Sequence, residues 1–213
     1  MITAQTSTIT FLQRQLTQYS THVFIGTFTN APVPVVSMYS NITGSLVYDV
    51  NAPFAAYNSP LVLPTVYVGG NIDISVAAFT VISFPLLQVV AGGFNIHALS
   101  VITAITAPLL TTVGSLDIDD DAQLNMITLP SLSIILGCGA ACNTIALVNN
   151  AVLTWVALPS LTSLSSVANI LICENARTFV IPETISNVWG GRQCYAYNGS
   201  ATQCSWTSFT ACP

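Results

Sequence analysis

Five short apolar segments recur along the chain, and a proline follows the centre of each after ten to twelve residues. The segments centre on Ile74, Ile96, Ile118, Leu147 and Ile172, and the prolines are Pro85, Pro108, Pro130, Pro159 and Pro182. The centres are spaced by 22, 22, 29 and 25 residues. A repeat of this length is typical of a solenoid, whose stacked coils bury together an apolar face that no single coil can bury.

Three further apolar columns keep the same register. They are Ile82, Ile105, Ile127, Val156 and Val180; Leu87, Leu110, Leu132, Leu161 and Ile185; and Val90, Val113, Ile135, Leu164 and Val188. Ile72 and Ile74 alternate with Asp73, which indicates strands. The pattern predicts an all-β, parallel β-solenoid with coils of about 22–29 residues stacked about 4.8 Å apart. Two fainter coils, around Phe24 with Pro34 and around Tyr48 with Pro60, bring the number to roughly seven.

The corners and ends of the predicted solenoid differ from its middle. Asp121, Asn150 and Asn175 follow the strand centres by three residues, where Asn and Asp suit a turn. The insertion 137–142 is expected to bulge from one corner. Residues 9–19 read as a short amphipathic helix, so we expect an N-terminal cap over 1–22, solenoid repeats over 23–190 and a Cys-rich C-terminal cap over 191–213.

The cysteines and sequons favour an oxidising compartment. All six cysteines lie in the last 76 residues of the chain, at Cys138, Cys142, Cys173, Cys194, Cys204 and Cys212, without a CxxC spacing. We expect three disulfides, and either a link from Cys138 to Cys142 or a link from one of them to Cys173 fits the repeat. The sequons at Asn41 and Asn198 predict N-glycosylation and an extracellular or cell-surface location.

Charge is scarce throughout. Only 5% of residues are charged, lysine is absent, and three arginines face eight acidic residues, for a net charge of −5. Nucleic acid is therefore not an expected partner, because binding it requires cationic side chains. Residues 76–114 contain no Asp, Glu, Lys or Arg, and such an uncharged stretch is also typical of membrane-spanning segments. Pro85, Pro108 and the β-branched residues there favour strands instead, so we expect no transmembrane segment.

One acidic cluster is the candidate metal site. Asp117, Asp119, Asp120 and Asp121 offer oxygen ligands for calcium, but their spacing is not that of an EF-hand loop. A solvated corner is the simpler interpretation, and we expect no bound cofactor. Asp73 and His97 should share the outer face of the strands with Asp117 and Asp119. No arginine or lysine accompanies them to hold a polysaccharide, so an enzyme is not expected.

Two parts of the chain resemble a known family. Residues 9–19 followed by Val23-Phe-Ile-Gly resemble the opening of a receptor L-domain, and the segments 124–135 and 153–164 resemble the repeats of fungal cell-surface proteins of the Ecm33 type. The resemblance implies a right-handed, leucine-rich-repeat-like solenoid that is secreted, glycosylated, associated with a cell wall or surface, and not enzymatic.

Two functions remain open at this point. The first is a non-enzymatic structural glycoprotein of a cell surface, wall or filament, which associates with copies of itself. The alternative is a receptor-type ectodomain that binds glycan or peptide on its flat sheet. Exposed aromatic residues gathered on one face would favour the alternative, and the candidates are Tyr48, Tyr57, Tyr67 and Trp155.

Overall fold

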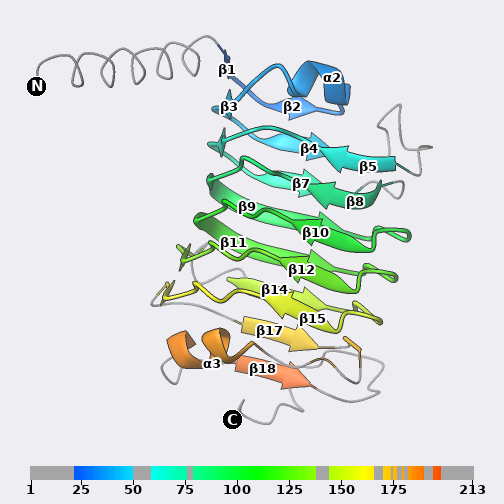
Figure 1. The fold of residues 1–213 in the computed structure, drawn as a ribbon, viewed down its shortest axis with the longest axis vertical. Coiled ribbons are helices and arrows are strands. Elements are labelled where there is room, and N and C mark those ends of the chain that lie inside the picture. The colour runs from blue at the N-terminus through cyan, green and yellow to red at the C-terminus, as the bar shows by residue number, and fades with distance from the viewer. Residues whose placement is uncertain are drawn as a thin grey trace, which may run out of the picture.

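A computed structural model describes residues 22–49, 59–75, 79–137, 144–165, 170–173, 175–176, 179, 182–189 and 194–197. The chain winds as a parallel β-solenoid whose coils follow one another from the N-terminal to the C-terminal end of the molecule (Figure 1). Neighbouring strands of successive coils are paired in parallel throughout the described residues. The predicted all-β architecture with a parallel β-solenoid is therefore confirmed.

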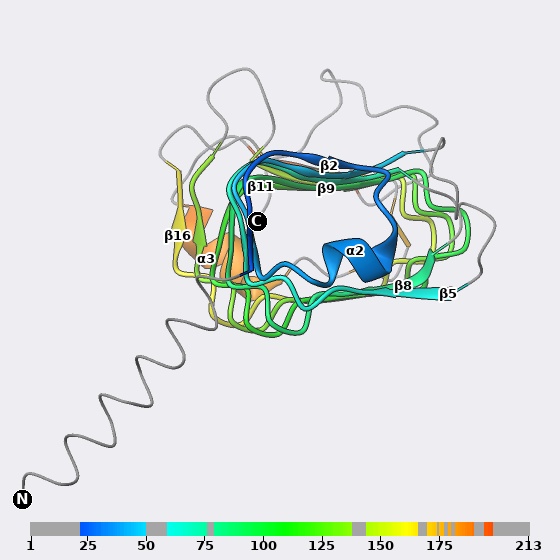
Figure 2. The ribbon, with the colours of Figure 1, turned by 90° about the horizontal axis from the view of Figure 1, so that it is seen from above.

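Within the described residues the coils build two sheets, one of 13 strands and one of five. Seen along the stack, the larger sheet covers two sides of the coil and the smaller lies across the core from it (Figure 2). The larger sheet contains β1 (Val23–Phe24), β2 (Phe28–Thr29), β3 (Asn41–Ile42), β4 (Leu46–Tyr48), β6 (Tyr67–Val68), β7 (Ile72–Ile74), β9 (Val89–His97), β11 (Thr112–Asp119), β13 (Ile134–Ile135), β14 (Ile145–Val148), β16 (Ser163–Leu164), β17 (Ile170–Cys173) and β18 (Cys194–Tyr197). The smaller sheet contains β5 (Ser59–Val62), β8 (Phe79–Ser83), β10 (Ala104–Thr106), β12 (Met126–Thr128) and β15 (Trp155–Ala157).

The apolar columns stack in the predicted register. Ile74, Ile96, Ile118, Leu147 and Ile172 pair in order through the larger sheet, and Tyr48 extends this column by one coil. The columns that begin at Ile82 and at Val90 also pair residue for residue as far as Val156 and Leu164. These residues and the column from Leu87 to Ile185 form one buried core. Val180 and the side chain of Val188 lie outside the described residues.

The first coil is the exception to the predicted register. Phe24 pairs with Ile42, which pairs with Val68 and then Val90. The predicted coil around Phe24 is present, but Phe24 belongs to the column of Val90 and not, like Tyr48, to the column of Ile74. The sequence was misleading because the second-sheet strand of this coil is replaced by the helix α2 (Val33–Val36), so the usual spacing to the proline is lost.

Prolines and hydroxyl groups shape the corners that follow the smaller sheet. Pro85, Pro108, Pro130 and Pro159 each stand two residues after the end of a strand, where no ladder hydrogen bond is required of them. The hydroxyl of Ser131 donates to the Pro108 carbonyl, and that of Ser160 donates to the Pro130 carbonyl, both at 2.6 Å. Uncharged side chains thus satisfy exposed backbone groups, which accounts for a surface rich in Ser and Thr.

Glycines line a second corner, which falls before the strands β4 and β7 and within the long strands β9 and β11 of the larger sheet. The N–H groups of Gly44, Gly70 and Gly92 donate to the carbonyls of Gly26, Gly44 and Gly70, at 2.8, 2.8 and 3.0 Å. A Cβ on Gly114 would lie 2.6 Å from the Gly92 carbonyl oxygen. The coils therefore approach one another here more closely than side chains would allow.

The expected insertion falls between β13 and β14. Residues 138–143 lie outside the described residues, so the predicted bulge is untested. Directly after these residues the backbone again pairs with the preceding coil, because the Leu116 N–H donates to the Thr144 carbonyl at 2.9 Å. The stack continues into β14 without a shift.

The two ends of the core are covered by different elements. At the N-terminal end Val36 of α2 is buried, and Phe24, Phe28 and Tyr39 pack together, with a ring-centroid distance of 3.8 Å between the two phenylalanines. At the C-terminal end lie β18 and the helix α3 (Glu183–Trp189), from which Ile185 is buried (Figure 1). The predicted helix over 9–19 lies outside the described residues, as does the Cys-rich tail apart from β18. Neither described helix has the length and apolarity needed to cross a membrane.

Candidate functional site

The acidic residues predicted to point outward lie on the outer face of β7, β9 and β11. Asp73, Asn95 and Asp117 form one column across these strands, and His97 pairs directly with Asp119 in the next column. The residues between them, such as Ile96 and Ile118, are fully buried. Alternation along the strand therefore fixes the polar side chains on the outside, as predicted.

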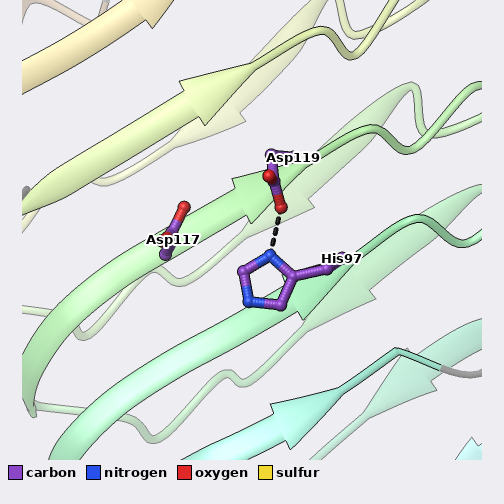
Figure 3. A group of neighbouring side chains, drawn as sticks. All are labelled: His97, Asp117 and Asp119. Carbon is purple, nitrogen blue, oxygen red and sulfur yellow. Dashed lines mark hydrogen bonds and ion pairs between the residues drawn. The ribbon is translucent and has the colours of Figure 1, made fainter. Parts of the chain in front are cut away.

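His97, Asp117 and Asp119 gather into one cluster (Figure 3). Their candidate ligand atoms all lie within 4.8 Å of one another. Nδ1 of His97 pairs with Oδ1 of Asp119, and the two side chains are 30% and 32% exposed. The cluster is half-buried, so the protein removes part of the water around its charges, and the remaining water still weakens the interactions between them.

The groups in the cluster perturb one another. The pKa of His97 is raised, chiefly by the hydrogen bond to Asp119; burial opposes this, and the charges of Asp119, Asp117 and Asp73 add to it. The pKa of Asp117 is also raised, chiefly by burial, while the nearby His97 lowers it. The raised pKa of His97 thus reflects the carboxylates around it, whereas the raised pKa of Asp117 reflects chiefly its burial.

Asp120 and Asp121 do not join this cluster, although the sequence placed all four aspartates in one candidate calcium site. Asp120 is exposed at the corner with φ +57°, and its carboxylate accepts a hydrogen bond from Nδ2 of Asn149. Asp121 is fully buried and points the other way. The expectation of a solvated corner is thus confirmed for Asp120 and wrong for Asp121, because the tight turn at Asp120 directs the next side chain inward.

Asp121 belongs instead to an internal column of side chains that link the coils. Its Oδ1 accepts the N–H of Leu99 at 2.7 Å, and its own N–H donates to Oδ1 of Asn150 at 3.1 Å. Asn150 and Asn175 repeat the arrangement one coil further on, at 3.3 Å. The sequence located this column at the corner but did not reveal that its side chains turn inward.

The amide groups of this column make a second bond. Nδ2 of Asn150 donates to the Ile118 carbonyl at 2.9 Å, and Nδ2 of Asn175 donates to the Leu147 carbonyl at 2.7 Å. The second oxygen of Asp121, Oδ2, is buried without a hydrogen-bond partner. Because Asp121 takes the place of Asn150 one coil earlier, we infer that this oxygen lies opposite the Ile96 carbonyl. Burial raises the pKa of Asp121 to about 7, and the Asp119 and Asp120 charges add to the rise, while the bond from Leu99 and the nearby His97 oppose it.

The outer cluster offers little for hydrolysis. The strand of Asn95 lies between those of Asp73 and Asp117, so two strand spacings, about 9.6 Å, separate the two aspartates. This distance is at the upper limit for the carboxylate pair of an inverting glycosidase. Ser75 stands one coil before His97 at the equivalent position, because the preceding residues Ile74 and Ile96 are paired. Its hydroxyl donates to the Tyr48 carbonyl at 3.5 Å.

The remaining predicted sites are described in part. Cys173 is buried and disulfide-bonded, and the side chains of the other five cysteines lie outside the described residues. Asn41 begins β3 and is half-buried, with Thr43 exposed two residues later, and Asn198 lies outside the described residues. The three disulfides and the two glycosylation sites therefore stay predictions.

The candidate aromatic residues do not gather on one face. Tyr48 is fully buried, and Tyr57 lies outside the described residues. Tyr67 is 38% exposed on β6 of the larger sheet, whereas Trp155 is 62% exposed on β15 of the smaller sheet. The two exposed rings therefore belong to different sheets.

Comparison of the chain with protein-family models, with curated proteins and with solved structures found no match. What the chain does must therefore be argued from its own residues.

Proposed function

We propose that the chain is a non-enzymatic extracellular structural protein of a cell surface, wall or filament, and that it associates with copies of itself. One observation carries the proposal: the outer face of the smaller sheet bears no charged residue from β8 to β15. Alternation places eight side chains on this face: Val81, Ser83, Ala104, Thr106, Met126, Thr128, Trp155 and Ala157.

These eight side chains form two straight rows. Val81, Ala104, Met126 and Trp155 pair in order, as do Ser83, Thr106, Thr128 and Ala157. The hydroxyls of Thr106 and Ser83 bond to each other at 3.1 Å, so part of the polar row satisfies itself within the sheet. Such a face loses little hydration when another surface covers it, because no charge has to be desolvated.

The same face offers an anchor for a second copy. Trp155 is 62% exposed and Met126, directly across from it, is 37% exposed. Buried tryptophan and methionine are enriched at the centres of protein interfaces. The whole chain carries a net charge of only −5, so repulsion between copies is weak at physiological salt.

An extracellular setting is part of the proposal. The disulfide at Cys173 is supporting evidence, because such bonds persist mainly in oxidising compartments. The sequons at Asn41 and Asn198 agree with it, as does the resemblance to fungal cell-surface repeat proteins. Assembly would then proceed side by side through the smaller sheet or end to end into filaments.

The exposed indole of Trp155 also suits the alternative role, binding of a glycan by stacking on a sugar ring. The separation of Trp155 from Tyr67 weakens it, because a glycan platform usually presents several rings together on one surface. Glycan binding is therefore the second candidate function, and the experiment below distinguishes it from self-association.

The experiment compares the wild-type chain with Trp155→Glu and with a control, Gln88→Glu, by light scattering and negative-stain microscopy. Gln88 is exposed directly before β9 and lies outside the strands of the smaller sheet. We expect Trp155→Glu to shift assemblies toward monomers and Gln88→Glu to leave them unchanged. Assembly equal in all three proteins would refute the role of this face. A monomeric wild type that binds soluble polysaccharides through Trp155 would favour the receptor-type role.

A further inference from the structure

The cluster of His97, Asp117 and Asp119 is held in place by the fold before any ligand arrives. All three residues stand on strands, β9 and β11, that pair along seven residue positions. The side chains between them are buried in the core, so the strands cannot rotate without breaking it. A site on such elements needs little reorganisation on binding.

The cluster also lacks compensating positive charge. Asp73 stands on the same face and its charge reaches His97 and Asp117. The chain has no lysine, and its arginines at positions 14, 177 and 192 all fall outside the described residues. Within the described part of the chain, three carboxylates therefore face one imidazole, a deficit that a divalent cation would neutralise.

The donor set selects the class of cation. One imidazole nitrogen with two carboxylate oxygens suits zinc and similar divalent ions, which accept nitrogen and oxygen at about 2.0–2.2 Å. Calcium prefers six to eight oxygens, and Asp120 and Asp121 do not contribute theirs. A bound ion would take the place of the proton between Nδ1 of His97 and Asp119.

We propose that His97, Asp117 and Asp119 bind one divalent cation of the zinc class on the outer face of the larger sheet, with water completing its coordination. The ion would join the coil of β9 to the coil of β11 through side chains, in addition to the backbone ladder. This site is independent of the uncharged face on which the proposed assembly rests.

The test is calorimetric titration of Zn²⁺ into the full chain after treatment with chelator, with the thermal midpoint of unfolding measured in parallel. We expect one saturable site per chain and a higher midpoint when zinc is bound. His97→Ala and Asp119→Asn should abolish both effects. One control, His22→Ala, should keep them, because it removes the other histidine of the chain and leaves the cluster intact.

Cobalt provides a second readout that does not depend on stability. Co²⁺ bound through an imidazole should give visible absorption bands that Zn²⁺ displaces and that His97→Ala lacks. The proposal is overturned if zinc shows no saturable binding to a folded wild-type chain. It is equally overturned if binding persists in both His97→Ala and Asp119→Asn, or if calcium binds in its place and is indifferent to His97→Ala.

Discussion

Asp121 is the only acidic side chain that lies fully buried in the described part of the chain. Its neighbours along the column, Asn150 and Asn175, use one amide oxygen and one amide nitrogen to join successive coils. Asp121 supplies the oxygen but has no N–H to offer the next carbonyl. A neutral carboxyl group supplies the missing donor, whereas a carboxylate leaves two acceptors facing each other.

Replacement of this residue should therefore stabilise the protein. We expect Asp121→Asn to raise the free energy of unfolding by about 1–3 kcal/mol at pH 8, because it restores a donor and removes a buried charge. The measurement is urea unfolding in the presence of chelator, so that no divalent cation contributes. A less stable Asp121→Asn variant at pH 8 would show that the carboxylate has a partner in solution.

The same change has a pH signature. The pKa of Asp121 is about 7 in the folded chain, against 3.8 for the ordinary carboxyl group. Between these values the folded chain binds more protons than the unfolded chain, so this residue lowers stability progressively as pH rises from about 4 to about 7. The advantage of Asp121→Asn should accordingly be largest above pH 7 and should shrink toward pH 4. An advantage that does not vary with pH would mean that Asp121 keeps an ordinary pKa.

At the scale of the elements, the register of the strands could be predicted because it depends on burial. A residue such as Ile118 must face the core in every coil, so apolar side chains recur at matching positions and reveal the stack. The first coil could not be placed in this way, since α2 replaces a strand there and changes the spacing. The His97–Asp119 contact was missed for a different reason: 22 residues separate the pair, and only the register brings them together.

The glycine corner was also missed, although the sequence contains its signal. Gly44, Gly70, Gly92 and Gly114 stand four residues before Tyr48, Ile74, Ile96 and Ile118, the residues of one core column. Polar or small residues at a turn are common, so the pattern becomes meaningful only when the close approach of the backbones is seen. It explains why no side chain occurs at this position in four successive coils.

The corner makes a prediction at the same scale. We expect Gly114→Ala to lower the free energy of unfolding by about 1–3 kcal/mol, because its Cβ would press on the Gly92 carbonyl, a backbone group that cannot move alone. Gly93→Ala is the matched control, since its Cβ would meet only the side chains of Asn95 and Ser115, which can rotate away. Equal losses in the two variants, measured by urea unfolding, would contradict the role of the corner.

The whole molecule is a stack of coils with few charges and with distinct sides. The carboxylates of Asp73, Asp117 and Asp119 occupy one face of the larger sheet, whereas the smaller sheet presents two uncharged rows around Met126 and Trp155. Composition alone predicted scarce charge, but not that the outer face of the smaller sheet would carry none between β8 and β15. The uncharged face is suited to contact with another copy, and the face with the aspartates is suited to a cation.

The central claim, that this chain is a self-associating structural protein, is tested most directly by the mass of the purified native particle across a dilution series. The chain has a mass of 22.5 kDa. We predict particles of several times this mass by multi-angle light scattering, dissociating on dilution, with elongated or sheet-like assemblies in negative stain. A strictly monomeric particle at every concentration, without filaments or sheets in the source material, would contradict the claim.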